Sequence, residues 1–169
     1  MFGDLQKSRV IAYSAAFLGL ITLGSWISIP FFPVPFTLQT LFILLAGAVM
    51  RRYAVIPVSL YIGLGLLGLP VFHNGMAGLG ILLGPTGGYL IGFLFAALIA
   101  GLAYESPSRY ARIGGLAMAT AAIYVCGIAW LIYSLGLSFF IAFFTGVLPF
   151  IIGDVIKASA AYLIAERIP

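Results

Sequence analysis

The sequence predicts an all-α integral membrane protein with six transmembrane helices and with both termini in the cytoplasm. Hydrophobic residues make up 63% of the chain and charged residues only 7%, whereas about a quarter of the residues in a soluble domain are charged. A spanning helix needs about 20 apolar residues, so the chain holds at most about eight spans. We therefore expect a single membrane domain over residues 1–169, and we exclude a soluble domain and a disordered segment.

The six spans are the apolar runs that end at charged residues or at proline and glycine. We expect them at residues 9–29, 37–50, 53–69, 86–104, 113–134 and 148–165. The first run is longer than the apolar core of a secretory signal and no small-residue cleavage site follows it, so we expect it to remain in the mature protein. The second and third runs are separated only by Arg51 and Arg52, which predicts a helical hairpin with its tip at the membrane interface.

The fourth and fifth spans carry packing signals. Pro85 suits the start of the fourth span. Gly84, Gly88 and Gly92 recur every four residues, which is typical of a face that packs closely against another helix. The fifth span contains Cys126, the single cysteine, so we exclude a disulfide framework and a thiolate metal site.

The positions of the basic residues predict the orientation. All lysines and arginines outside the sixth span fall on the N-terminal side of the membrane: Lys7, Arg9, Arg51, Arg52, Arg109, Arg112 and Arg167. Both termini should therefore be cytoplasmic, in a multi-pass protein of the cell membrane. Because these residues lie at segment junctions and form no patch, we expect the lipid bilayer and no nucleic acid as a partner.

The three loops on the opposite side, near residues 30–36, 70–85 and 135–147, carry no charge. These loops are either short, tight connections or a lid folded over a cavity. The middle loop is longer than the usual helix connection of about 2 to 8 residues, which favours the lid. This loop contains His73 and Asn74. A lone histidine cannot form a metal cluster or a Ser-His-Asp set, so we expect no enzyme and leave His73 out of the site.

Asp154 and Lys157 are the two charges inside a span. They lie roughly 15 to 20 Å above the cytoplasmic end of the sixth span, where each charge costs about 2.5 to 3.5 kcal/mol. Their spacing of three residues places them on one helix face. They are either an ion pair that fixes helix packing or a polar ligand site, with Lys157 suited to a carboxylate and Asp154 to N–H groups. The second interpretation predicts an acid that also carries a urea or amide.

Three further polar side chains are candidates to join this pair. Gln39 opens the second span, Asn74 lies in the middle outer loop, and Tyr89 follows the glycines of the fourth span. Gln39 could instead anchor a loop, and Asn74 could instead be a turn residue before Gly75. The chain has no P-loop motif, so any work driven by ATP requires another subunit.

Four segments together closely resemble the BioY biotin-transporter family. They are Pro35–Thr40 (PFTLQT), Gly68–Phe72 (GLPVF), Leu83–Tyr89 (LGPTGGY) and Pro149–Lys157 (PFIIGDVIK). The resemblance implies a substrate-binding S component of an energy-coupling factor (ECF) transporter, with six helices and a biotin site near the outer surface. It also implies a transmembrane coupling subunit and two ATPase subunits as partners, and no cofactor.

Matched position by position, the family's site residues fall on the same candidates. The family's biotin-site aspartate and lysine match Asp154 and Lys157, and its loop asparagine matches Asn74. Gln39 and Tyr89 follow from the motifs that contain them.

A second pattern concerns the partner subunits. Ala12 and Ala16 match the Ala-x-x-x-Ala feature on the first helix of these S components, which contacts the coupling subunit; without the resemblance, internal packing would explain them as well. Two alternatives stay open: an S component for another vitamin, such as thiamin or riboflavin, and a membrane scaffold subunit that does not transport.

Overall fold

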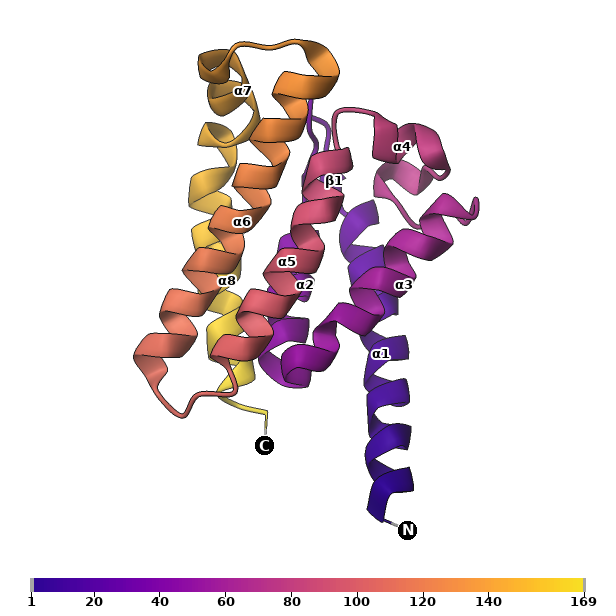
Figure 1. The fold of residues 1–169 in the computed structure, drawn as a ribbon, viewed down its shortest axis with the longest axis vertical. Helices are drawn as coiled ribbons and strands as arrows, with labels where there is room; N and C mark the ends of the chain where they lie inside the picture. The colour runs from indigo at the N-terminus through magenta and orange to yellow at the C-terminus, as the bar shows by residue number, and fades with distance from the viewer. Residues whose placement is uncertain (1, 169) are drawn as a thin grey trace.

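Helices dominate the computed structural model, which describes the backbone of residues 2–168 and the side chains of residues 7–168. Each of the six predicted spans contains a helix (Figure 1). These helices are α1 (Phe2–Trp26), α2 (Gln39–Met50), α3 (Val55–Leu66), α5 (Gly87–Ala103), α6 (Arg109–Leu135) and α8 (Ile151–Ala165). Among the described residues, four stretches are long and apolar enough to cross a membrane: Lys7–Trp26, Gln39–Leu66, Arg109–Leu135 and Phe139–Ala165. Gly87–Ala103 is a shorter apolar helix.

The stretch Gln39–Leu66 is folded back on itself. A short 3-10 turn, η1 (Arg51–Ala54), separates α2 from α3, and Figure 1 shows the chain reversing there, so the two helices form the arms of the expected hairpin. Arg51 has a positive φ of 55°, and a Cβ on Gly101 of α5 would collide with the Arg51 carbonyl. The glycine therefore lets α5 pack directly against the backbone of the hairpin tip.

An ion pair ties the hairpin tip to the end of α5. Arg52 donates two hydrogen bonds to Glu105, one to each carboxylate oxygen at 2.7 and 2.6 Å. These bonds lower the pKa of Glu105 and raise that of Arg52. Both groups are open to solvent, so the pair orients the tip more than it stabilises the fold.

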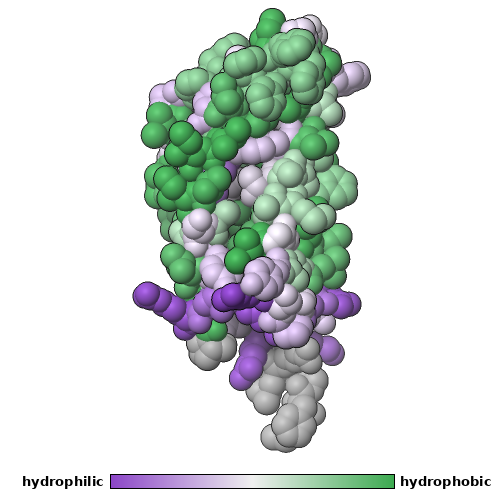
Figure 2. Space-filling view, turned by 90° about the vertical axis from the view of Figure 1, so that its left-hand side faces the viewer, coloured by the Kyte–Doolittle hydropathy of each residue, from purple (hydrophilic) through white to green (hydrophobic). Residues whose placement is uncertain are grey.

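Among the described side chains, the exposed charges gather at one end of the molecule. Figure 2 shows hydrophilic residues gathered in a band near one end, while the rest of that face is mostly apolar. Both termini lie at this end in Figure 1. The separation of charged and apolar surface is the pattern expected of a protein that spans a bilayer.

The opposite end contains short elements that the sequence did not predict. The segments at this end, which we call the outer segments after the predicted orientation, form several short elements. They are two short helices, α4 (Leu79–Leu83) and α7 (Phe139–Gly146), two 3-10 turns, η2 (His73–Gly75) and η3 (Leu148–Phe150), and the strands β1 (Ser28–Ile29) and β2 (Phe36–Thr37). The strands pair antiparallel, with Ser28 opposite Thr37 and Ile29 opposite Phe36. The uncharged outer loops are thus an ordered cap.

Gly88 and Gly92 pack α5 against α6, as their spacing predicted, whereas Gly84 lies before α5 and an added Cβ there would meet the Gly80 oxygen. A Cβ on Gly88 would collide with Trp130 and with the backbone oxygen of Cys126, and one on Gly92 would lie 2.8 Å from the Cα of Ile123. Close contact of this kind is how small residues stabilise helix pairs in membranes.

Gly88→Ala is expected to destabilise the protein by about 1–3 kcal/mol, because the added methyl group overpacks the α5–α6 contact. The measurement is thermal unfolding of the detergent-purified protein. Gly114→Ala is the matched control: this glycine lies on α6 with no atom within 4 Å of an added Cβ, so the change should be neutral or stabilise by about 0.5–1 kcal/mol. Equal melting temperatures for the two variants would contradict the packing account.

Candidate functional site

A narrow cavity of about 60 Å³ lies beneath the outer segments. This is below the range of about 300–1,000 Å³ typical of small-molecule sites, so a bound ligand would have to move its walls apart. Its walls come from α2, α3, α5, α6 and α8 and from the outer segments that precede α2 and α4. The apolar part of the lining consists of Val34, Pro35, Phe72, Ile81, Leu90, Phe93, Ile123 and Phe150. Polar groups enter this apolar space at two places.

The first polar group is a charged cluster that joins α2, α6 and α8. Lys157 donates to Asp154 Oδ1 at 2.8 Å and to Thr40 Oγ1 at 3.1 Å. Thr40 in turn donates to the same Asp154 oxygen at 3.0 Å, and Tyr124 donates to Asp154 Oδ2 at 2.6 Å. Asp154 and Lys157 are only 4% and 6% exposed, so these hydrogen bonds replace the water that both charges lose on burial.

An aromatic stack covers Lys157. The Phe36 ring lies parallel to that of Phe150, with centroids 5.9 Å apart, and Lys157 Nζ is 3.8 Å from the Phe36 ring centroid. A Cβ on Gly153 would collide with the Phe36 ring, so the glycine before Asp154 makes room for the stack. Two of the three ammonium protons meet oxygen acceptors, and the Phe36 face supplies a weaker cation–π contact.

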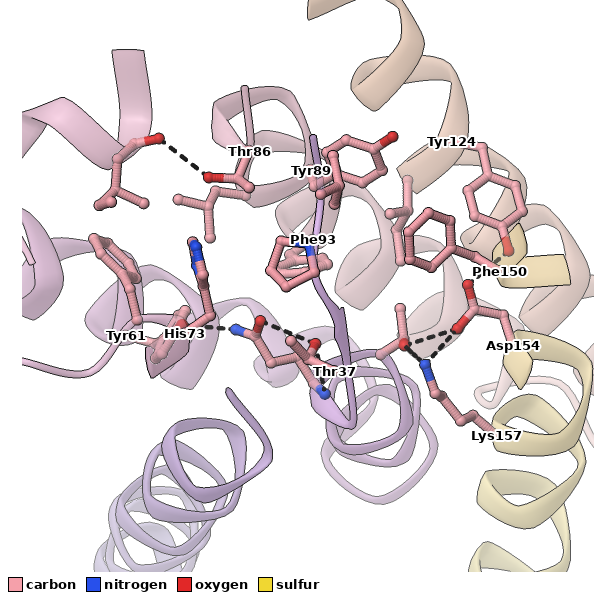
Figure 3. A pocket seen from close by; sticks show the side chains of 18 residues that line it. Thr37, Tyr61, His73, Thr86, Tyr89, Phe93, Tyr124, Phe150, Asp154 and Lys157 are labelled. Carbon is pink, nitrogen blue, oxygen red and sulfur yellow. Dashed lines mark hydrogen bonds and ion pairs between the residues drawn. The ribbon is translucent and has the colours of Figure 1, made fainter. Parts of the chain in front are cut away.

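The second polar group is uncharged and centres on α2 and α3. Gln39 Nε2 donates to the hydroxyl of Tyr61 at 2.6 Å, and its Oε1 accepts from Thr37 at 3.2 Å. His73 borders the cavity from the outer segment. In Figure 3, Tyr61 and His73 lie on the opposite side of the cavity from Asp154 and Lys157, with Phe93 between them. The site thus has a charged end and a neutral polar end, joined by apolar walls.

The structure brings four of the five predicted binding residues to this cavity. Asp154, Lys157, Gln39 and Tyr89 line it. Tyr89 contributes its ring, because its hydroxyl donates to the Gly146 carbonyl at 2.7 Å.

Asn74, the fifth predicted residue, is exposed and borders a separate, outer hollow. Its Oδ1 accepts a hydrogen bond from Ser28 at 2.7 Å. A contact between Asn74 and a ligand in the cavity would require the η2 turn to move.

Sequence reasoning missed several lining residues. Thr40 and Tyr124 complete the charged cluster, Tyr61 pairs with Gln39, and His73 lines the cavity although we left it out. Thr40 lies inside the PFTLQT segment, which could have flagged it. The only sequence feature of Tyr124 is a hydroxyl deep in an apolar run. Such hydroxyls are too common to identify a site residue.

The candidate contacts for a partner subunit lie on α1. Ala12 and Ala16 are both exposed, and α1 extends beyond the other helices at the end that holds the termini (Figure 1). The side chains of these alanines are therefore accessible to a second helix.

Comparison with known proteins establishes the family. The sequence model of the BioY family matches residues 3–169. The chain belongs to the BioY family. It is 40% identical over 164 residues to a probable biotin transporter BioY of Pyrococcus horikoshii, covering 96% of this chain and 98% of that protein. It is also 40% identical over 169 residues to the biotin transporter BioY of Thermotoga maritima, covering 95% of each.

A solved structure shows the same fold. The crystal structure of the S component for biotin from an ECF-type ABC transporter superposes with a TM-score of 0.87 at 30% identity, covering 97% of this chain and 92% of that one. The fold of this BioY family member is thus that of an ECF S component. Its named relatives are transporters, not enzymes.

Proposed function

We propose that this chain is the biotin-binding S component of an ECF-type vitamin transporter. The observation that carries the proposal is the buried Asp154–Lys157 pair, which lines a mostly apolar cavity. Buried charges at membrane depth are costly and mark functional sites. The BioY relatives named as biotin transporters support biotin as the ligand.

The charged end of the cavity suits the ureido group of biotin. Asp154 and Lys157 are 2.8 Å apart, which favours one ligand group that contacts both over an acid on Lys157 and a separate amide on Asp154. A ureido group presents a carbonyl acceptor to Lys157 and N–H donors to Asp154 at the same place. It is also neutral, whereas a carboxylate here would meet the like charge of Asp154. The ureido carbonyl would replace the weak contact between Lys157 and Phe36.

The remaining predicted residues take supporting roles in this proposal. Gln39 belongs to the neutral polar end, toward which the valerate chain of biotin would extend, and Tyr89 forms part of the apolar wall. Asn74 would act from the rim of the outer cap. The apolar lining suits the bicyclic ring and the methylene groups between the two polar ends.

We further propose that the chain spans the plasma membrane six times with both termini in the cytoplasm. The hairpin of α2 and α3 supplies two spans from one apolar stretch, and the charged end of Figure 2 matches the rule that basic residues stay on the cytoplasmic side. In this orientation the ligand cavity lies toward the outer surface, under the uncharged cap.

Transport in this proposal depends on partner subunits. A transmembrane coupling subunit would contact the exposed face of α1 at Ala12 and Ala16, where small side chains allow close helix packing. Two ATPase subunits would supply the energy, since the chain has no P-loop motif of its own. Their involvement is supported by the similarity to an S component of an ECF-type ABC transporter.

Competition binding tests the ligand. Labelled biotin should bind to the detergent-purified, ligand-stripped protein and should be displaced by unlabelled biotin. Thiamin and riboflavin in about hundredfold excess should leave it bound, because neither carries a cyclic urea joined to a flexible acid. Displacement by either vitamin would transfer the proposal to that vitamin. A folded protein that binds none of the three would favour the scaffold alternative.

A further inference from the structure

His73 stands between two hollows. Together with Pro35 it lines both the ligand cavity and the outer hollow formed by Pro30, Phe31, Phe32, Pro33 and Asn74. Among the described residues, these are the two that border both spaces. A ligand that moved directly from the outer hollow to the cavity would pass next to the imidazole.

The neighbours of His73 fix the direction of its side chain. The preceding Phe72 is 1% exposed and packs edge-to-face on Tyr61, with ring centroids 5.5 Å apart. The following Asn74 adopts a positive φ of 55° and accepts a hydrogen bond from Ser28 on the other outer segment. With Phe72 held in the core and Asn74 held at the surface, the imidazole faces the cavity, as Figure 3 shows.

His73 is also the polar side chain of the cavity that has no hydrogen-bond partner among the residues described. Every other polar side chain in the lining has one: Thr37, Gln39, Thr40, Tyr61, Thr86, Tyr89, Tyr124, Asp154 and Lys157. The side chain is half-buried, so its ring nitrogens can bond to water when no ligand is bound. A ligand group in the cavity would provide the missing partner.

Burial lowers the pKa of His73 below its usual value, which favours the neutral imidazole. A neutral imidazole has one N–H donor and one acceptor. If the ureido group occupies the charged end of the cavity, as in the proposed function, the acid of biotin would lie toward His73. An N–H donated to a carboxylate is a charge-assisted hydrogen bond, which is stronger than a bond between neutral groups.

We propose that His73 is a specificity-determining residue that donates a hydrogen bond to the carboxylate of the bound ligand and closes the cavity behind it. This inference rests on the proposed function, because it takes biotin as the ligand. In this proposal, His73 of the outer cap recognises the carboxylate of biotin, and Lys157 does not.

The test compares two ligands and three variants in the purified, full-length protein. The ligands are biotin and biotin methyl ester, which keeps a carbonyl acceptor but loses the charge. The variants are His73→Phe, which keeps the bulk without a donor, His73→Gln, which keeps an N–H, and Met76→Ala as a control on an exposed residue that follows the same turn. Dissociation constants and biotin off-rates are measured by titration and by chase.

His73→Phe should weaken biotin binding about tenfold, mostly through a faster off-rate, and should weaken ester binding no more than about threefold. His73→Gln should stay within about threefold of the wild type, as should Met76→Ala. Wild-type affinity in His73→Phe, or an equal loss for both ligands, would overturn the inference and leave His73 as a packing residue. Even if His73→Phe does not fold, a wild-type protein that binds the ester as tightly as biotin would overturn it. A wild-type protein that binds neither ligand would instead overturn the proposed function.

Discussion

Lys157→Met should lower the affinity for biotin by a factor of at least about 30 and should also destabilise the protein. The ammonium is the one cation that faces Asp154 within the described chain, and removal of one partner of a buried, hydrogen-bonded charge pair costs about 2–5 kcal/mol in binding. The carboxylate left behind is uncompensated, which costs about 3–5 kcal/mol of folding stability unless it takes up a proton. Titration with biotin and thermal unfolding measure the two effects separately.

The double variant Asp154→Asn with Lys157→Met is the control for stability. It removes both charges, so stability should recover in part while biotin binding stays lost, because hydrophobic or neutral replacement of a complete buried pair is often tolerated. If the double variant bound biotin as the wild type does, the pair would be a packing device, as in the scaffold alternative.

Ala12→Leu combined with Ala16→Leu should abolish biotin uptake driven by the partner subunits and leave binding by the isolated chain within about twofold of the wild type. Both alanines are exposed on α1, so larger side chains should not disturb the fold, but they would separate two helices that pack through small residues. Uptake is measured in vesicles that contain the coupling subunit and the ATPases.

The matched control is Ala129→Leu, which makes the same change at an exposed position of α6. It should leave both uptake and binding intact. Full uptake by the α1 variant would place the partner contact elsewhere, and full uptake in vesicles without partner subunits would remove the need for them.

The long helices of this fold can be predicted from the sequence because the features that indicate them lie within each segment. Apolar runs and the charges between them locate the six long helices, and Arg51 with Arg52 marks the hairpin tip. The short helices α4 and α7 and the β1–β2 pair were not predicted. They are too short to show a periodic pattern, and their conformation depends on packing between the outer segments, which lie far apart along the chain.

The sequence identified the site residues most clearly where burial carries a high energetic cost. Asp154 and Lys157 stand out because a charge within a span demands an explanation. Thr40 and Tyr124 complete the same cluster, yet a hydroxyl in an apolar helix costs little and gives no comparable signal. The roles of His73 and Asn74 depend on which way adjacent side chains of one turn point, and the sequence does not specify that direction.

A structure of the protein with biotin bound would test the proposed site most directly. We expect the ureido group to lie within hydrogen-bond distance, about 3.2 Å or less, of both Asp154 and Lys157, with the carboxylate beneath the outer cap beside His73. Biotin in the same cavity with its carboxylate on Lys157 would reverse the assigned orientation. Biotin bound outside this cavity would contradict the account.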